Sequence, residues 1–366
     1  GYHLACLATD EHGVVELRRR KHRDERPLAV MVRDRAAAEA ICALDAADAE
    51  LLEDRRRPIV LLSRRTDAAV RIRVADAAAP GNPLLGLMLP YTPLHHLLMA
   101  ELAGHPLVMT SGNRSDEPIA HEDADAFQRL GDIADLFLTH DRPIHRRCDD
   151  SIVRRVGGHP LILRRSRGYV PAPLPLPFAC ASPVLAVGGQ MKATFALGSE
   201  DSAILSHHEG DLDDYAAWRA YVAAIEDFER FFDIKPAWIA HDLHPDYAST
   251  RNALQRSETG AGLTRLAVQH HHAHLASCLA DNGATQPAIG VIFDGTGYGT
   301  DGAVWGGEFL WGDCAGFKRA AHLRYVAMPG GEQAIREPWR MAAAYLLDAL
   351  GDCTLLHDAI PASKLR

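Results

Sequence analysis

Short apolar runs alternate with helix-like segments along the first half of the chain. Runs bounded by Gly, Pro, Arg or Asp predict buried strands at 28–32, 57–64 and 105–113. The segment 121–130 is typical of a helix with acidic residues in its first turn. Helices that alternate with strands in this way predict an α/β domain.

The second half of the chain repeats this alternation and adds glycine-rich turns. Strands are predicted at 183–189, 193–199, 236–242 and 288–297, and a long helix is predicted at 214–232. In open α/β sheets, ligands bind at the carboxyl ends of strands. We therefore expect the binding sites of this half at its glycine-rich turns.

A proline-rich seam separates the two halves. The stretch GYVPAPLPLPFACASPV contains five prolines between Pro171 and Pro183. Proline interrupts both helices and central strands, so this stretch is typical of an extended connector. It divides the chain near residue 178, into a first domain at 1–178 and a second domain at 179–366.

Composition narrows the class of protein. The 366 residues are 47% hydrophobic and 24% charged, which is typical of globular domains. No apolar run approaches the roughly 20 residues of a membrane span, so we expect no membrane partner. The net charge of −9 argues against a nucleic-acid partner. Seven scattered cysteines without a CxxC pair favour reduced thiols and a cytoplasmic protein.

The stretch VQHHHAHLASCLADN places four histidines within five residues. In a helix, His272, Leu275 and Leu279, together with Ala276, form an apolar stripe. His270 lies about 160° from His272 around such a helix, so its face points away from that stripe. His270 and His274 are four residues apart on this other face. His271 and His272 are interpreted as packing residues or residues that support the ligands.

This pattern leaves two interpretations open. A solvated helix surface explains the histidines without any ligand. Alternatively, His270 and His274 hold one metal ion, with Asp294, at the end of the apolar strand that begins at Ala288, as a third ligand. Two histidines and one carboxylate suit Fe(II) or Zn(II) and leave positions open for a substrate.

Two glycine-rich segments of the second domain are candidate phosphate loops. The first contains Gly188 and Gly189, followed by Lys192 and Thr194; the second is DGTGYGTDG, which begins at Asp294 and includes Gly295, Thr296 and Gly297. Glycines allow backbone N–H groups to approach phosphate oxygens closely. Each segment alone is also consistent with a plain β-turn, whereas the pair favours a split phosphate site of the actin, Hsp70 and sugar-kinase type.

The first domain carries three polar segments that together suit a triphosphate. Their candidate residues are Lys21 and Arg23; Ser111 and Asn113; and Arg147, Asp150, Ser151 and Arg154. Separately, these segments are also consistent with a solvated basic patch and polar turns. Cations and small hydroxyl or amide donors on neighbouring loops are the groups that bind phosphates.

The order and spelling of these segments resemble a known family. KxR, TSGN and RPIHRRCDDSIVRR look like the YrdC-like domain, which makes carbamoyl-type adenylates from ATP. GGQMKATFAL, LSHHEGDL, HDLHPDYAST, VQHHHAH, DGTGYGTDGAVWGGEF and PGGEQAIREPWRMA resemble the carbamoyltransferase domain of the hydrogenase maturation family HypF. The seam RRSRGYVPAPL matches as well. The resemblance implies a twisted mixed sheet followed by an actin-like, RNase H-like domain.

The resemblance also implies a reaction. Carbamate, derived from carbamoyl phosphate, and ATP with Mg²⁺ would form carbamoyl-adenylate in the first domain. The second domain would pass the carbamoyl group to the C-terminal cysteine of HypE, the precursor of a cyanide ligand of [NiFe]-hydrogenase. The implied catalytic residues are Lys21 and Arg23. The implied nucleotide-binding residues are Lys21, Arg23, Ser111, Asn113, Ser151, Arg154, Gly188, Gly189, Lys192, Asp294, Gly295, Thr296 and Gly297. One divalent Zn or Fe ion would bind His270, His274 and Asp294.

The chain departs from the family pattern at both ends. Three other functions are also considered. An upstream acylphosphatase domain, a CxxC-rich region and the last metal carboxylate are expected to be missing, so the second domain is expected to be truncated. Threonylcarbamoyl transfer to tRNA uses the same domain types. A metalloprotease would require HExxH, whereas the sequence has HHHAH. An inactive remnant that only binds a partner is the third alternative.

Overall fold

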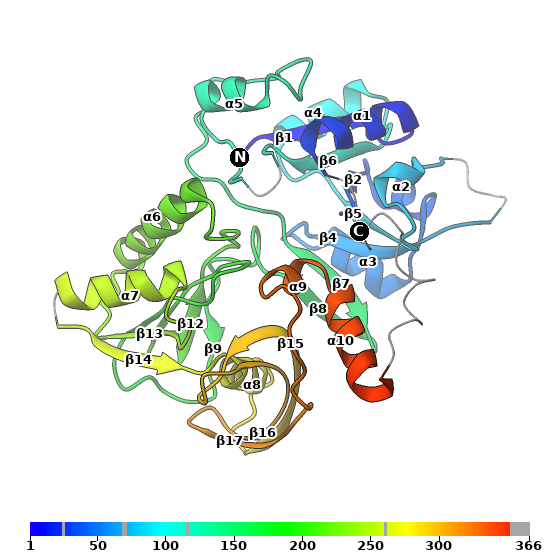
Figure 1. Ribbon diagram of the computed structural model, residues 1–366. Coiled ribbons are helices and arrows are strands. Elements are labelled where there is room, and N and C mark those ends of the chain that lie inside the picture. Colours follow the sequence, from blue (N-terminus) through cyan, green and yellow to red (C-terminus); the bar gives the residue numbers. More distant parts are fainter. Residues whose placement is uncertain (24–25, 68–71, 115–116, 260–261, 352–366) are drawn as a thin grey trace.

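A computed structural model describes residues 1–23, 26–67, 72–114, 117–259 and 262–351. Figure 1 shows an α/β domain built from the first half of the chain, beside a second α/β region that continues into a small curved sheet. Within these residues, no helix combines the length and apolar character that crossing a membrane requires.

The first domain contains one mixed sheet in the order β1-β6-β2-β5-β4-β7-β8, with β3 beside β4. Its strands are β1 (His3–Leu7), β2 (Ala29–Met31), β3 (Cys42–Ala43), β4 (Ile59–Arg64), β5 (Leu84–Met88), β6 (Leu107–Ser111), β7 (Ile152–Val156) and β8 (His159–Arg164). The pairs β2–β5 and β4–β7 are parallel, and the other pairs are antiparallel.

Helices cover both faces of this sheet. They are α1 (Glu11–Lys21), α2 (Arg35–Glu39), α3 (Ala46–Glu53), α4 (Pro93–Glu101) and α5 (Asp123–Leu130), with one 3₁₀ turn, η1 (Asp76–Ala78). Side chains alternate across the strands, so Val30 and Val108 join the core beneath α1, while Met31 and Met109 pack with Met99 of α4. This double coverage explains why the strands are almost continuously apolar.

The second domain begins with a six-stranded sheet in the order β14-β13-β10-β11-β12-β9. Its strands are β9 (Leu174–Pro175), β10 (Val184–Ala186), β11 (Ala196–Ser199), β12 (Ser202–Leu205), β13 (Trp238–Asp242) and β14 (Thr264–Val268). Helices α6 (Tyr215–Phe232) and α7 (Ala248–Thr259) pack on it through one core that includes Leu185, Tyr221 and Ala253.

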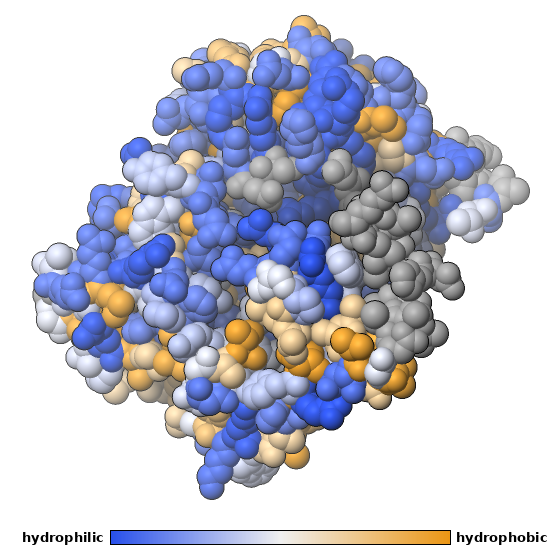
Figure 2. Space-filling view, viewed as in Figure 1, coloured by the Kyte–Doolittle hydropathy of each residue, from blue (hydrophilic) through white to orange (hydrophobic). Residues whose placement is uncertain are grey.

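A three-stranded antiparallel sheet, β15-β16-β17, follows helix α8 (His270–Asp281). Its strands are β15 (Ala288–Tyr298), β16 (Val304–Gly312) and β17 (Phe317–His322), and helices α9 (Gln333–Arg336) and α10 (Trp339–Leu350) come after them. Leu275 and Leu279 of α8 pack against Trp305 and Leu310 of β16. In Figure 2, hydrophobic side chains gather around β15 and α10.

Each helix and strand predicted from the periodicity is present, with two differences in detail. β9 lies ahead of residue 178 and already pairs with β12, so the proline-rich seam supplies an edge strand of the second sheet. Asp294 was expected at the end of a strand, but it lies inside β15, which continues through a bulge between Phe293 and Gly297 to Tyr298. The expected reduced thiols agree with the six described cysteines, which are free.

Candidate active site

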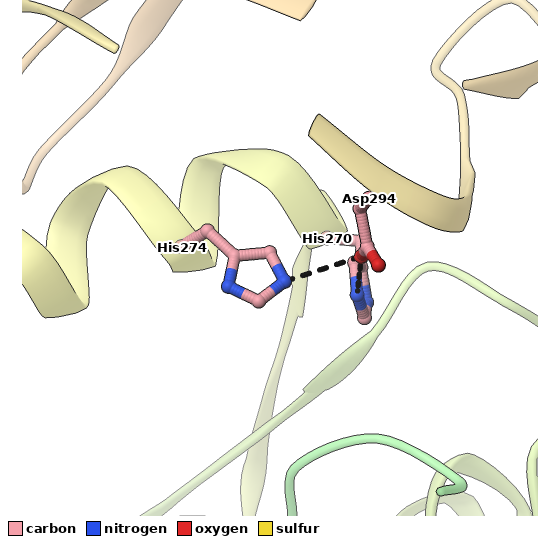
Figure 3. A group of neighbouring side chains, drawn as sticks. All are labelled: His270, His274 and Asp294. Atoms are coloured by element: carbon pink, nitrogen blue, oxygen red, sulfur yellow. Dashed lines mark hydrogen bonds and ion pairs between the residues drawn. The ribbon is translucent and has the colours of Figure 1, made fainter. Parts of the chain in front are cut away.

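Three predicted metal ligands converge in the second domain. The Nε2 atom of His270 lies 2.9 Å from Oδ2 of Asp294, and the Nε2 atom of His274 lies 3.2 Å from the same oxygen. One ligand atom from each residue lies within 4.8 Å of the other two. Figure 3 shows both imidazoles, carried by one helix, directed at the carboxylate from the neighbouring strand.

The sequence of α8 fixes the orientation of the two imidazoles. Gln269 is the N-cap, and its side-chain oxygen accepts a hydrogen bond of 2.9 Å from the backbone N–H of His272. His271, Leu275 and Leu279 are the buried positions of the helix. Their spacing of four residues leaves His270 and His274 on the adjoining, more exposed face.

Leu275 and Leu279 of the predicted apolar stripe are buried, but its first position was wrong. His271, with no exposed surface, occupies the buried row, whereas His272 is half-buried. The ring of His272 packs against Phe317, and its Nε2 atom lies 2.9 Å from the carbonyl oxygen of Asp313. The difference arises because β16 and Trp305 cover the helix beside His271, which periodicity alone could not locate.

A fourth residue, Asp242 at the end of β13, was not predicted. Its Oδ2 atom lies 2.6 Å from Nδ1 of His270, and its Oδ1 atom accepts a hydrogen bond of 2.8 Å from the backbone N–H of His244. Asp242 is 9% exposed. The carboxylate thus binds the ring nitrogen that faces away from Asp294. The signal was the motif HDLHPDY, in which Asp242 is the last residue of the predicted strand 236–242.

The two carboxylates make this site strongly favourable for positive charge. The hydrogen bond to Asp242, followed by that to Asp294, raises the pKa of His270 to about 9. The hydrogen bonds from His270 and then from His274 hold the pKa of Asp294 far below its usual value. Two imidazole nitrogens and a carboxylate oxygen that converge in a negative environment suit a divalent transition metal. The residues present therefore fit such an ion.

Both glycine-rich segments of the second domain flank the first turn of α8. A Cβ atom on Gly189 would lie 3.9 Å from Cε1 of His270, and one on Gly297 would lie 2.5 Å from Cε1 of His271. Gly297 therefore has to be glycine for β15 to pack on the helix. Gly188 has a φ of 68° in the left-handed region that favours glycine.

Other residues of these segments are open to solvent. Lys192 is exposed, and its backbone N–H donates to Oδ1 of Asp211 at 2.6 Å. Gly295 is exposed and Thr296 is half-buried, both beside Asp294 on β15. The structure therefore brings the predicted phosphate segments of this domain together around the histidine helix.

In the first domain, Lys21 is buried at the end of α1 and binds the loop after β6. Its Nζ atom lies 2.6 Å from the carbonyl oxygen of Ser111, 2.5 Å from that of Asn113 and 2.7 Å from Oδ1 of Asn113. Burial, aided by the nearby charge of Arg23, lowers the pKa of Lys21 to about 7. Lys21 thus holds together the two segments that the sequence predicted to converge.

Arg23 is the more accessible of the two predicted cations. It is half-buried, and its guanidinium donates to the carbonyl oxygen of Pro27 at 2.8 Å and lies 3.5 Å from Oγ1 of Thr110. Ser111 donates from Oγ to Oδ1 of Asn113 at 2.7 Å. Arg23, Ser111 and Asn113 therefore share one end of the sheet, where β6 ends.

The residues around 147–154 are divided between structural and exposed positions. Ser151 is fully buried; its hydroxyl donates to the carbonyl oxygen of Arg167 at 2.9 Å and accepts from the backbone N–H of Ser166 at 2.8 Å. In this conformation Ser151 supports the chain, which differs from its predicted role as a nucleotide ligand. Asp150 pairs with Arg167 at 2.7 Å, Arg147 is half-buried, and Arg154 points into solvent from β7.

Three family models match consecutive parts of the chain. They are described as "Telomere recombination" (residues 1–166), "HypF Kae1-like domain" (residues 179–281) and "Carbamoyltransferase, Kae1-like Domain, second subdomain" (residues 290–364). The first is the Sua5, YciO and YrdC family. The order of the three models is the order of domains that the sequence motifs predicted.

Curated relatives and solved structures agree with these models. Carbamoyltransferase HypF2 of Cupriavidus necator is 46% identical over 94% of this chain and 44% of its own length, and carbamoyltransferase HypF of Rhodobacter capsulatus is 45% identical over 99% and 48%. A crystal structure of full-length HypF in a phosphate- and nucleotide-bound form is 42% identical and covers all of this chain and 47% of its own, with a TM-score of 0.91. The chain thus spans about half the length of these relatives.

Proposed function

Because the chain belongs to the HypF family of carbamoyltransferases, we propose that it carries two linked reactions of hydrogenase maturation. In the first domain, carbamate and ATP form carbamoyl-adenylate and pyrophosphate. In the second domain, the carbamoyl group passes to the C-terminal cysteine of HypE, and AMP is released. The protein would act in the cytoplasm, without a nucleic-acid or membrane partner.

The first reaction is adenylation. A carbamate oxygen attacks the α-phosphorus of Mg²⁺-bound ATP, the new P–O bond forms, and pyrophosphate leaves with the electrons of the broken bond. Arg23 is half-buried beside the end of β6, where its guanidinium can bind triphosphate oxygens. Lys21 supports this site by holding the loop of Ser111 and Asn113 in place.

The second reaction is acyl transfer. The HypE thiolate attacks the carbamoyl carbon, and the bond from that carbon to the phosphate oxygen breaks, so that AMP leaves. His270, His274 and Asp294 would hold a Zn or Fe ion, which when bound polarises or orients the carbonyl group. Gly189 lies beside His270 and would let the adenylate approach the helix N-terminus closely, while Gly188 and Gly297 allow the close packing of the two loops.

One observation carries the proposal. The same chain carries Lys21 and Arg23 at the end of β6 in one domain and a His–His–Asp group in the next, and the order of the two domains matches HypF. The motif HHHAH argues against a metalloprotease. The Glu that acts as the base in HExxH follows the first histidine, and that position is His271 here. Carbamoyl-adenylate is a mixed anhydride that water hydrolyses. Making and using it within one molecule would limit this hydrolysis.

The test is pyrophosphate exchange into ATP with different acyl donors. We expect exchange that depends on carbamate and is absent with threonine plus bicarbonate. Exchange that requires threonine would instead favour threonylcarbamoyl chemistry. No exchange with any donor, from a protein that binds ATP, would favour an inactive module that only binds a partner. Arg23→Ala serves as the control for a reaction located in the first domain.

A further inference from the structure

The two domains meet along a polar seam formed by residues 146–149 of the first domain and by residues 207–209 and α6 of the second. Arg146 forms an ion pair with Asp227 of α6. The Nδ1 atom of His208 lies 2.9 Å from Oδ2 of Asp149. On the face shown in Figure 2, the surface is hollowed between the two domains, and the visible walls are hydrophilic.

Asp149 connects this seam to the proposed nucleotide site. Its negative charge acts on both Lys21 and Arg23, where it opposes the lowering of their pKa values by burial. Asp149 precedes Asp150, whose Oδ2 atom lies 3.4 Å from Nε2 of His3, and His3 pairs with Ser111 across β1 and β6. Asp149 therefore lies near the loop that Lys21 holds, yet in the described residues its carboxylate contacts His208 and not Arg23. Its side chain is only 20% exposed, so solvent screens its charge weakly.

The contact with His208 determines whether the carboxylate of Asp149 can compete with ATP for Arg23. A carboxylate that is free to turn toward Arg23 would form an ion pair with it and compete with the triphosphate for the same guanidinium. The imidazole of His208, which belongs to the other domain, is hydrogen-bonded to Oδ2 of Asp149. The other titratable groups that act on Asp149 include Arg164, Asp150 and Cys148 of its own domain, and His207 and Glu209 of the second domain.

We propose that His208 of the second domain is a positioning residue for the nucleotide site of the first domain. It holds the carboxylate of Asp149 at the domain seam and thereby keeps it from pairing with Arg23. The adenylation site is then not autonomous, because its affinity for ATP depends on how the second domain is docked. This inference rests on the proposed adenylation function for its biological meaning. The effect of His208 on the affinity for ATP can be measured without that reaction.

The experiment measures equilibrium binding of Mg·ATP, without carbamate, to the full chain. The relevant binding component is the one that Arg23→Ala removes. His208→Ala should weaken it by roughly fivefold or more. His208→Asn, which keeps an N–H donor near the position of Nδ1, should retain most of the affinity. The double variant His208→Ala/Asp149→Ala should regain it, because the competing carboxylate is gone.

His322→Ala is the matched control, since His322 is an exposed histidine of the second domain on β17, and its ATP affinity should equal that of the parent. Unchanged affinity in His208→Ala would overturn the inference, as would a loss that persists in the double variant. The second result would mean that His208 acts only through the fold. Failure of carbamate-dependent exchange in the parent would refute the proposed function separately, because the ATP comparison still decides the role of His208.

Discussion

The Nδ1 atom of His270 lies 2.6 Å from Oδ2 of the buried Asp242, while its Nε2 atom faces Asp294 at 2.9 Å. Each ring nitrogen thus has its own carboxylate. A carboxylate behind a histidine fixes the tautomer and orientation of the ring and increases its basicity toward a metal ion. This arrangement separates residues that would bind the ion from a residue that orients them.

Asp242→Asn should weaken metal binding by about 10- to 100-fold and leave the fold intact. An amide can present an N–H toward Nδ1 and so favour the wrong tautomer of His270. Metal titration of the apoprotein with Zn²⁺ measures the affinity. Asp246→Asn is the matched control, because Asp246 is an exposed acid of the same motif. Equal affinities for both variants and the parent would refute the orienting role.

The ligand assignment predicts different outcomes for neighbouring histidines. His270→Ala and His274→Ala should each abolish stoichiometric metal and spare adenylation in the first domain. His272→Ala should retain the metal but cost about 1–2 kcal/mol of unfolding free energy, since it loses its contact with the Asp313 carbonyl and the Phe317 ring. Elemental analysis and chemical denaturation provide the two readouts. Metal retained by His274→Ala would show that another group completes the site.

Lys21 and Arg23 should differ although both belong to the KxR motif. Arg23→Ala removes charge-assisted contacts worth roughly 1.5–3 kcal/mol to ATP, so exchange should fall at least about tenfold, with a smaller loss of stability than at Lys21, because Arg23 is only half-buried. Lys21→Met removes the donor to the carbonyl oxygens of Ser111 and Asn113 and should lower both stability and exchange. Thermal unfolding distinguishes the two variants. A Lys21→Met protein with parental stability would contradict the clamp between α1 and β6.

Glu209 predicts a pH dependence of stability. Burial raises its pKa from 4.5 to about 8, so its contribution to stability is complete below 4.5 and is lost as the pH rises through 8. The neighbouring His207 has its pKa lowered by burial to about 4, so its contribution is present above 6.5 and is lost as the pH falls through 4. Between pH 6.5 and 8, the pH dependence of stability from this pair therefore comes from Glu209 and not from His207.

In that window, Glu209→Gln should become progressively more stable relative to the parent as the pH rises, by at most about 1.4 kcal/mol per pH unit. Urea denaturation of both proteins at pH 6.5 and 8 gives the difference between their unfolding free energies. The titration of all other groups contributes equally to both proteins and cancels in this difference. A constant difference across the window would mean that Glu209 is ionised throughout.

Periodicity and motif order predicted much of this molecule. The strands and helices depend on local patterns, and His270, His274 and Asp294 could be grouped because their spacing places two ligands on one helix and one on the next strand. Asp242 could not be placed, since its contact with His270 depends on how β13 and β14 pair side by side. The contact of His208 with Asp149 spans two domains, and no local pattern encodes how domains dock.

The first position of the buried row on α8 was wrong for a related reason. The stripe through His272 satisfies helical periodicity as well as the true one through His271, because histidine is neither clearly apolar nor clearly polar. Only the position of Trp305 on β16 decides between them. Lys21 likewise was expected to face ATP, whereas the loop of Ser111 and Asn113 closes over its ammonium group.

The most direct test of the account identifies the adenylate itself. The protein is incubated with Mg·ATP and ¹³C-labelled carbamate, quenched rapidly and analysed by mass spectrometry, with and without threonine. We expect ¹³C-labelled carbamoyl-adenylate that forms with or without threonine and disappears in Arg23→Ala. A threonylcarbamoyl-adenylate that appears only when threonine is present, or cleavage of ATP to ADP without any adenylate, would contradict the assignment.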